Sequence, residues 1–155
     1  MRREGLYGPL WPGHQLPRCV PPGWWNVSPI LVILGHLWAL PTSLLGLLLA
    51  LVGGARPVRL DGPERAWVWH VSGGLLGWLF RSWSFRIGAQ TIGAVILVVP
   101  ECDPRLLTHA RCHVRQAFAL GALYLPVYLV SWLAAGCSYA DNWMEKQARK
   151  AAGEP

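Results

Sequence analysis

An uncharged stretch from Val27 to Ala55 constrains the fold of this chain more than any other feature. Within it, Ile30 to Val52 is almost continuously apolar and long enough to cross a hydrocarbon core of about 30 Å as a helix. Pro41 interrupts the run, so we expect either one kinked helix or two shorter pieces that form a re-entrant hairpin. His36 lies inside the run and is expected to be neutral and satisfied by a neighbouring carbonyl. The sequence therefore predicts an N-terminal transmembrane segment at 27–55.

The composition of the whole chain supports this class. Of its 155 residues, 53% are hydrophobic and only 14% are charged, which is unusual for a soluble domain. A lead at 1–26, rich in Pro, Gly and Trp, precedes the apolar run, so a cleavable signal peptide is not expected. The net charge of +6 comes from dispersed Arg residues without a basic run interleaved with aromatics. We therefore expect a lipid bilayer as a partner and no nucleic acid.

The flanking arginines indicate how the segment is oriented. Arg56, Arg59 and Arg65 follow it closely, whereas Arg18 is the one basic residue shortly before it. Because Lys and Arg are enriched on the cytoplasmic side of membrane segments, the region after the run is expected to be cytoplasmic.

The region 56–155 predicts a small α+β domain. Ala66–Val71 and Thr91–Val99 are rich in β-branched and aromatic residues and predict two strands of a short antiparallel β element. Ser72–Phe80 between them predicts a glycine-rich amphipathic or interfacial connection. The alternative that Ile87–Val99 is a membrane helix is disfavoured because the segment is too short to cross.

Two histidines four residues apart, His109 and His113, give the domain its most informative motif. Asp103 and Pro104 predict an N-cap and the first residue of a helix that carries both, and this spacing places both rings on one helix face, where they can share a metal ion. Zinc peptidases of the HExxH type place Glu directly after the first His, as the base that takes a proton from the zinc-bound water. Here that residue is Ala110, so the sequence predicts a metal site while arguing against the usual hydrolysis.

The C-terminal part predicts two more helical segments. The stretch 117–140 carries no charge and predicts a buried or interfacial apolar helix with a break near Pro126. As one continuous helix it would be long enough for a second membrane crossing, so one or two crossings remain open. Asp141 to Ala152 is charged, lacks Gly and Pro, and predicts a helix capped by Asp141.

The four cysteines allow a second kind of metal site. Cys19, Cys102, Cys112 and Cys137 contain no CxxC pair, which fits a reducing compartment and does not indicate a disulfide scaffold. The last three lie in the half of the chain that holds the two histidines. A mixed Cys and His zinc site therefore remains an alternative.

Three segments together resemble a known group of proteins: Leu106 to Gln116 (LLTHARCHVRQ), the apolar Leu123 to Trp132, and Tyr139 to Ala148 (YADNWMEKQA). The group consists of small bacterial membrane-associated proteins in which an H-E-R-x-H-x-R-Q helix is followed by an apolar segment and a D-N-P-F-E-x-E-A element. Those proteins in turn resemble the gluzincin metallopeptidases, where two His of one helix and a Glu of a later helix bind zinc. The similarity covers roughly residues 37–150. It implies a zincin-like helical C-terminal half, zinc as the metal, and the bacterial inner membrane as the location.

Carried over position by position, the resemblance makes His109 and His113 metal ligands and Glu145 the third ligand. Asp141 and Asn142 become candidates for orienting a ligand, because metal-bound His usually donates to a second polar group. For Asp141, helix capping is an equally good explanation. No catalytic residue is assigned, because Ala110 stands where the general base is expected.

This chain departs from the group at two places, and the departures leave three functions open. Ala110 replaces the catalytic Glu, whose loss typically costs about 10²–10⁴-fold in rate, and Trp143-Met144 replaces the Pro-Phe of the terminal element. The main prediction is a metal-binding, catalytically degenerate metallopeptidase relative with a structural or interaction role and a protein or peptide partner. The alternatives are an active zinc peptidase with an unorthodox base and a metal-free small membrane protein.

Overall fold

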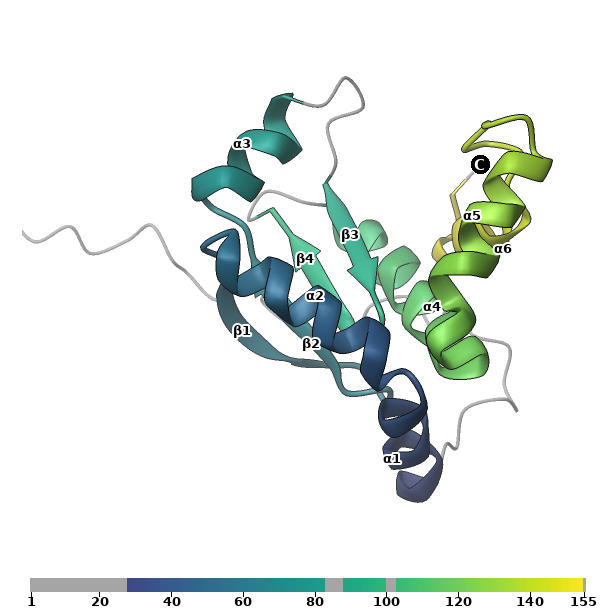
Figure 1. Cartoon of the computed structure of the whole chain (residues 1–155), viewed down its shortest axis with the longest axis horizontal. Helices are drawn as coiled ribbons and strands as arrows, with labels where there is room; N and C mark the ends of the chain where they lie inside the picture. Colours follow the sequence, from purple (N-terminus) through teal and green to yellow (C-terminus); the bar gives the residue numbers. More distant parts are fainter. Residues whose placement is uncertain (1–27, 83–87, 100–102, 155) are drawn as a thin grey trace, which may run out of the picture.

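The computed structural model describes residues 28–82, 88–99 and 103–154, and it confirms an α+β architecture (Figure 1). The predicted lead at 1–26 and Cys102 lie outside the described residues. The elements in chain order are α1 (Pro29–Trp38), α2 (Leu40–Val52), β1 (Arg56–Asp61), β2 (Ala66–His70), α3 (Gly74–Ser82), β3 (Ala89–Ile92), β4 (Val95–Val98), α4 (Pro104–Leu120), the 3₁₀ turn η1 (Gly121–Leu123), α5 (Tyr124–Ala134) and α6 (Trp143–Ala152).

The apolar segment at the start consists of two helices rather than one straight span. α1 and α2 meet at Ala39 and are bent relative to each other by 72°. Pro41 lies in the first turn of α2, where its missing N–H has no partner to lose. His36 donates through Nδ1 to the Val32 carbonyl at 2.9 Å, as predicted. By length and composition alone, Arg105–Ala134 is a second helical stretch that could cross a membrane.

The sheet is mixed, so the prediction of a purely antiparallel element is wrong. Its strand order is β1-β2-β4-β3, with antiparallel outer pairs and a parallel central pair, β2 and β4. The predicted connection after β2 contains helix α3, and a crossover of this kind lets two strands run parallel.

The predicted strand Thr91–Val99 is in fact a hairpin of β3 and β4. The chain turns at Gly93, which has a φ of +64°, a conformation that favours glycine. A Cβ at this position would also lie 2.4 Å from the Ser43 backbone nitrogen on α2. The turn therefore brings the hairpin directly onto α2, and the Ala94 N–H donates to Ser43 Oγ at 2.9 Å.

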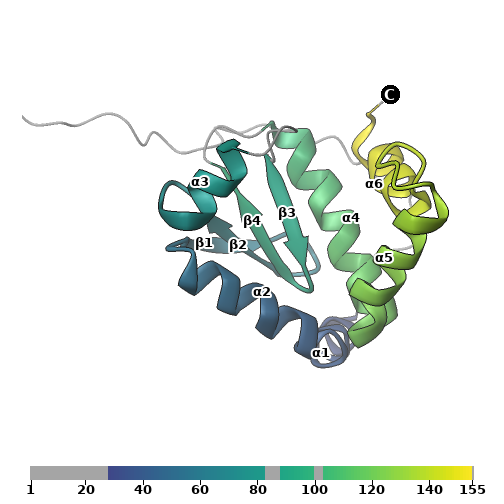
Figure 2. The same cartoon turned by 45° about the horizontal axis from the view of Figure 1, so that its top comes forward.

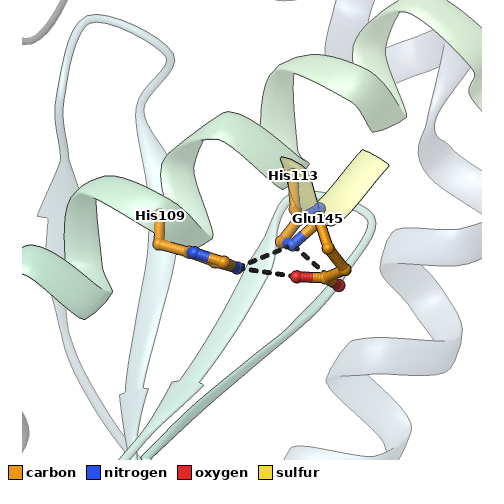
Figure 3. A group of neighbouring side chains, drawn as sticks. All are labelled: His109, His113 and Glu145. Atoms are coloured by element: carbon orange, nitrogen blue, oxygen red, sulfur yellow. Dashed lines mark hydrogen bonds and ion pairs between the residues drawn. The ribbon is translucent and has the colours of Figure 1, made fainter. Parts of the chain in front are cut away.

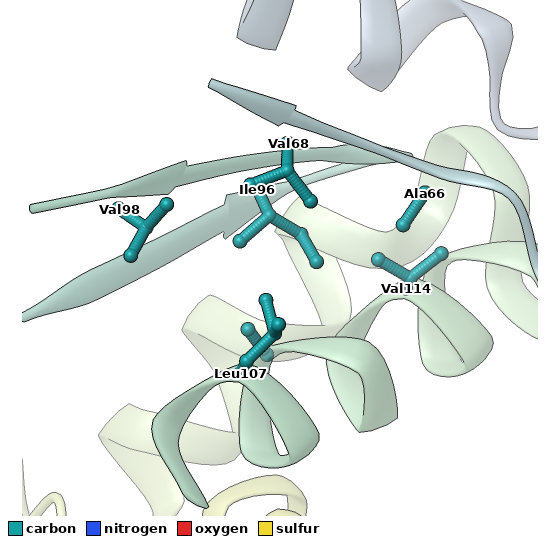
Figure 4. Packing of buried hydrophobic residues seen from close by; sticks show 7 residues of the cluster. Ala66, Val68, Ile96, Val98, Leu107 and Val114 are labelled. Carbon is teal, nitrogen blue, oxygen red and sulfur yellow. The ribbon is translucent and has the colours of Figure 1, made fainter. Parts of the chain in front are cut away.

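Helices cover both faces of the sheet (Figures 2 and 4). Because side chains alternate along a strand, β4 is buried on both sides. Ile96 and Val98 belong to a cluster with Leu107 and Val114 of α4, whereas Leu97 packs on the opposite side in a cluster with residues of α2 and α3. This arrangement places α4 firmly against one face.

The N-terminus and one side of α4 are further anchored by polar groups. The Asp103 carboxylate accepts from the Arg105 N–H at 2.8 Å, which confirms the predicted N-cap. Glu64, buried in the turn between β1 and β2, accepts from Arg111 at 3.1 Å and from Arg115. These ion pairs tie the β1–β2 hairpin to α4.

The C-terminal helices differ from the prediction in two details. The break in the apolar stretch lies at η1, where Gly121 has a φ of +60°, and not near Pro126, which fits into the first turn of α5. The N-cap of α6 is Asn142, whose side chain accepts from the Met144 N–H at 3.0 Å, and not Asp141.

Large apolar side chains are exposed on several helices, and those of α1, α2 and α5 make up the largest set. We call this set the apolar surface. It comprises Ile30, Leu31, Ile33, Leu34, Leu37 and Trp38 of α1, Leu40, Leu44, Leu45, Leu48, Leu49, Leu51 and Val52 of α2, and Leu129, Val130 and Leu133 of α5.

Candidate metal centre

Two histidines of α4 and one glutamate of α6 converge in a buried group (Figure 3). His109 Nε2 lies 3.0 Å from Glu145 Oε2, and His113 Nε2 lies 3.3 Å from Glu145 Oε1. The two Nε2 atoms are 3.1 Å apart. One ligand atom from each residue lies within 4.8 Å of the others, and the three residues are 2–7% exposed. The structure thus brings together the three residues that the sequence predicted as ligands.

The packing of α6 on α4 positions Glu145. Met144 and Ala148 are fully buried, and Met144 packs in a cluster with Ala117 of α4. The Asn142 cap sets where α6 begins, and Glu145 follows in its first turn, where a negative charge is favourable next to the positive end of the helix dipole. Ser131 of α5 donates to the Asn142 side chain, so this helix start is held from a third element.

The side chain of Gln116 determines which ring nitrogen of neutral His113 carries the proton. Gln116 Nε2 donates to the Met144 carbonyl at 3.1 Å, and because a carbonyl only accepts, the amide oxygen must face the other way. That oxygen lies 2.7 Å from His113 Nδ1, which must carry the proton to donate. Neutral His113 therefore directs the lone pair of Nε2 at Glu145 and His109.

His109 has one proton to place in its neutral form, and both positions leave a conflict. Its buried Nδ1 has no hydrogen-bond partner among the described residues, although Glu154 Oε2 lies 3.4 Å away. A proton on Nε2 can face Glu145 but leaves the Nδ1 lone pair towards the Glu154 carboxylate. A proton on Nδ1 can be donated to Glu154, but the lone pair of His109 Nε2 then faces the lone pairs of His113 Nε2 and of the Glu145 carboxylate.

Glu145 is held as a carboxylate. Burial alone raises its pKa, but the imidazoles of His109 and His113, when they carry a proton towards the carboxylate, and the hydroxyl of Tyr128 hold the pKa of Glu145 well below its usual range. Tyr128 on α5 donates to Glu145 Oε1 at 2.6 Å. A second hydroxyl, that of Tyr139, lies 3.4 Å from His109 Nε2.

A metal ion fits this donor set. With a proton on each Nδ1, two imidazole lone pairs and one carboxylate face a common centre, and a divalent cation at that centre would relieve their mutual repulsion. Two His and one Glu are ligands that zinc accepts, and three protein ligands leave a fourth position open. The buried group can therefore hold a metal ion, and the lone pair of His113 is aimed at the place where it would lie.

The other predicted site residues lie near the group with different contacts. Ala110 is buried in the cluster between α4 and the sheet, and its carbonyl accepts from Thr91 Oγ1 at 3.1 Å. Asp141 is exposed and bonds to Ser138 and Lys146. Asn142 holds the start of α6. Cys112 is buried and Cys137 exposed, and neither belongs to a metal-binding group within the described residues.

Sequence reasoning did not single out the residues that orient the ligands: Gln116, Tyr128, Tyr139 and Glu154. For Gln116 a signal existed, because it lies three residues after His113 on the same helix face. The tyrosines and Glu154 are brought in from other elements by tertiary packing.

Comparisons of this chain with known proteins identified no relative. No protein-family model matches the chain, and neither the curated proteins nor the solved structures include a significant match. The resemblance to gluzincin-like proteins, described above from the sequence, therefore stays a prediction.

Proposed function

We propose that this chain is a zinc-binding membrane-associated protein, a relative of metallopeptidases that has lost hydrolytic activity and has a structural or interaction role. The single observation that carries the proposal is the buried group of His109, His113 and Glu145, in which Gln116 leaves the His113 Nε2 lone pair unprotonated. In this proposal the ion ties α4 to α6 and compensates the buried carboxylate.

The missing base supports a role other than hydrolysis. Ala110 offers only a methyl group, and it packs among apolar side chains against the sheet. Zinc with three protein ligands keeps one open position, which can bind water or the carboxylate of a protein or peptide partner. A partner of that kind would use the metal without any bond being broken.

The first test is the zinc content of the full chain purified in detergent. We expect near-stoichiometric zinc in the natural protein and its loss in His109→Ala, His113→Ala and Glu145→Ala. Lys146→Ala, an exposed neighbour of Glu145 on the same helix, is the matched control and should keep the metal.

Further variants and one assay separate the competing functions. Loss of zinc in a Cys102/Cys112/Cys137→Ser triple variant would indicate that a mixed set of Cys and His residues binds the metal instead. A natural protein without zinc, or with any other divalent metal in its place, would contradict the proposed cofactor. Peptide hydrolysis that a chelator abolishes and that His109→Ala lacks would identify an active peptidase instead.

A further inference from the structure

In two of the helices that carry the apolar surface, α2 and α5, the exposed side is apolar and the fully buried positions hold small or hydroxyl-bearing residues. The buried side of α2 consists of Thr42, Ser43, Gly46 and Ala50. Helices that pack in a lipid environment use small and hydroxyl-bearing residues at their contacts, whereas a soluble domain buries its large apolar residues. The exposed side of α2 instead carries leucines.

The same inversion occurs on α5. Tyr124, Tyr128 and Ser131 lie on one side of the helix and face the protein, with hydroxyls that bond to Glu145 and Asn142 in the latter two. Leu129 and Val130 on the other side are more than half exposed. Two helices from distant parts of the chain thus share one pattern, which points to lipid rather than water outside.

The sheet restricts how these helices can meet a bilayer. α2 packs along β3 and β4, with Gly46 so close that a Cβ would lie 2.6 Å from the Ile92 carbonyl oxygen. Among the residues that the structure describes, β1 and β3 are the edge strands, and their outer backbone groups have no strand partner there. In hydrocarbon these groups would find no water, so the sheet must remain outside the lipid. An upright α2 would carry the sheet to its own depth in the membrane.

The lengths of α1 and α2 also argue against a membrane crossing by these helices. α1 has 10 residues and α2 has 13, so at 1.5 Å per residue they are about 15 and 20 Å long, against a hydrocarbon core of about 30 Å. The 72° bend prevents them from adding up to one straight span, although two helices joined at any angle can both lie in one plane. In the second candidate span, Arg105–Ala134, Leu107 and Val114 pack against the sheet, and only α5 has a free apolar side.

From these relations we infer that α1 and α2 lie flat in one leaflet of a lipid bilayer, with the outer side of α5 against the same leaflet, and that the described chain does not cross the membrane. Figures 1 and 2 show α1 at the corner between α2 and α5. Trp38 at the end of α1 packs against Gly121, which leads into α5, so the three helices form one continuous region. The inference rests on the proposed membrane association, and it does not depend on the metal.

Labelling from the two sides of the membrane tests this arrangement. In a full chain with its four cysteines changed to Ser, we would introduce Ser28→Cys, Ser72→Cys or Asp141→Cys, all at exposed positions outside the apolar helices. A membrane-impermeant maleimide would be added to right-side-out and to inverted vesicles from expressing cells, and detergent-solubilised samples would show that each thiol can react. All three positions should react in the same vesicle orientation.

Each other outcome overturns the inference in a defined way. Ser28→Cys reacting opposite to Ser72→Cys would show that α1 and α2 cross together. Asp141→Cys opposite to Ser72→Cys would show a crossing by the second stretch.

Flotation with phosphatidylcholine and phosphatidylglycerol vesicles tests the association itself. The purified chain should float, and Leu48→Glu combined with Val130→Glu should reduce the floated fraction several-fold, whereas Gln147→Glu, at an exposed position on α6, should not. A chain that forms oligomers and does not float would contradict both this inference and the membrane part of the proposed function. Flotation together with opposite-side labelling would contradict the flat arrangement alone.

Discussion

Gln116 donates to the backbone carbonyl of Met144, and this bond fixes the proton of His113 on Nδ1. The consequence is that one imidazole of the candidate metal centre is prepared to bind a cation before any ion arrives. Hydrogen-bond partners of this kind commonly account for a 10–100-fold difference in metal affinity.

Gln116→Ala should therefore weaken zinc binding by about 10–100-fold without removing the ligands. The measurement is a competition titration against a chelating zinc indicator, with the full chain in detergent. Gln147→Ala, which removes an exposed partner of Gln116, is the matched control and should have a smaller effect. Equal affinity in Gln116→Ala and the natural chain would contradict the role assigned to this side chain.

Asn142 and Asp141 are adjacent in the sequence, but we expect only Asn142 to contribute substantially to the free energy of unfolding. Asn142 is fully buried, caps α6 and accepts from Ser131, so Asn142→Ala should lower the free energy of unfolding by about 1–3 kcal/mol. Asp141 is exposed, and Asp141→Ala should stay within about 0.5 kcal/mol. Thermal or denaturant unfolding of both variants checks the difference. A larger loss from Asp141→Ala would mean that the cap assignment is wrong.

A carboxylate introduced at Ala110 should destabilise the folded protein and should not by itself produce peptidase activity. Ala110 is 2% exposed between α4 and the sheet, where an unpaired carboxyl group is expected to cost several kcal/mol. Ala110→Glu should therefore unfold at a clearly lower temperature than Ala119→Glu, which changes an exposed position of the same helix. A stable Ala110→Glu variant with chelator-sensitive peptidase activity would show instead that the new side chain reaches the metal.

The contact between α2 and the β3–β4 hairpin leaves no room for a methyl group at Gly46. A Cβ there would lie 2.6 Å from the Ile92 carbonyl oxygen, so Gly46→Ala should cost roughly 1–3 kcal/mol despite the better helix propensity of Ala. Gly73→Ala is the control, because no atom of the described part of the chain lies within 4 Å of its Cβ position. If Gly46→Ala unfolded at the same temperature as the natural chain, α2 would not pack on the sheet as described.

Zinc should also stabilise the folded chain by mass action. A ligand that binds only the folded state at about 100 times its Kd adds roughly 2.7 kcal/mol at 25 °C. A chelator should accordingly lower the unfolding temperature of the natural protein and leave that of Glu145→Ala unchanged. Equal responses of the two proteins would indicate that the chelator acts elsewhere.

Much of this protein could be predicted from local sequence. The α+β class, the strand at Ala66, and the helix start at Asp103 depend on residues within one or two turns of each other. The apolar run before Arg56 and the spacing of His109 and His113 are equally local, because chemical composition and helix periodicity determine them. Glu145 entered as a candidate ligand only through the family resemblance.

Only the tertiary structure decided how these parts meet. The parallel pairing of β2 and β4 depends on a crossover through α3, which no local pattern in the strands specifies. The partners of the ligands, Tyr128 and Glu154, come from elements that packing alone brings to α4. Pro41 predicted an interruption between α1 and α2, but the 72° angle between them is seen only in the structure, where α2 packs on a sheet whose strands come later in the chain. Composition determined that this chain has a large apolar surface, and long-range packing decided which side of each helix presents it.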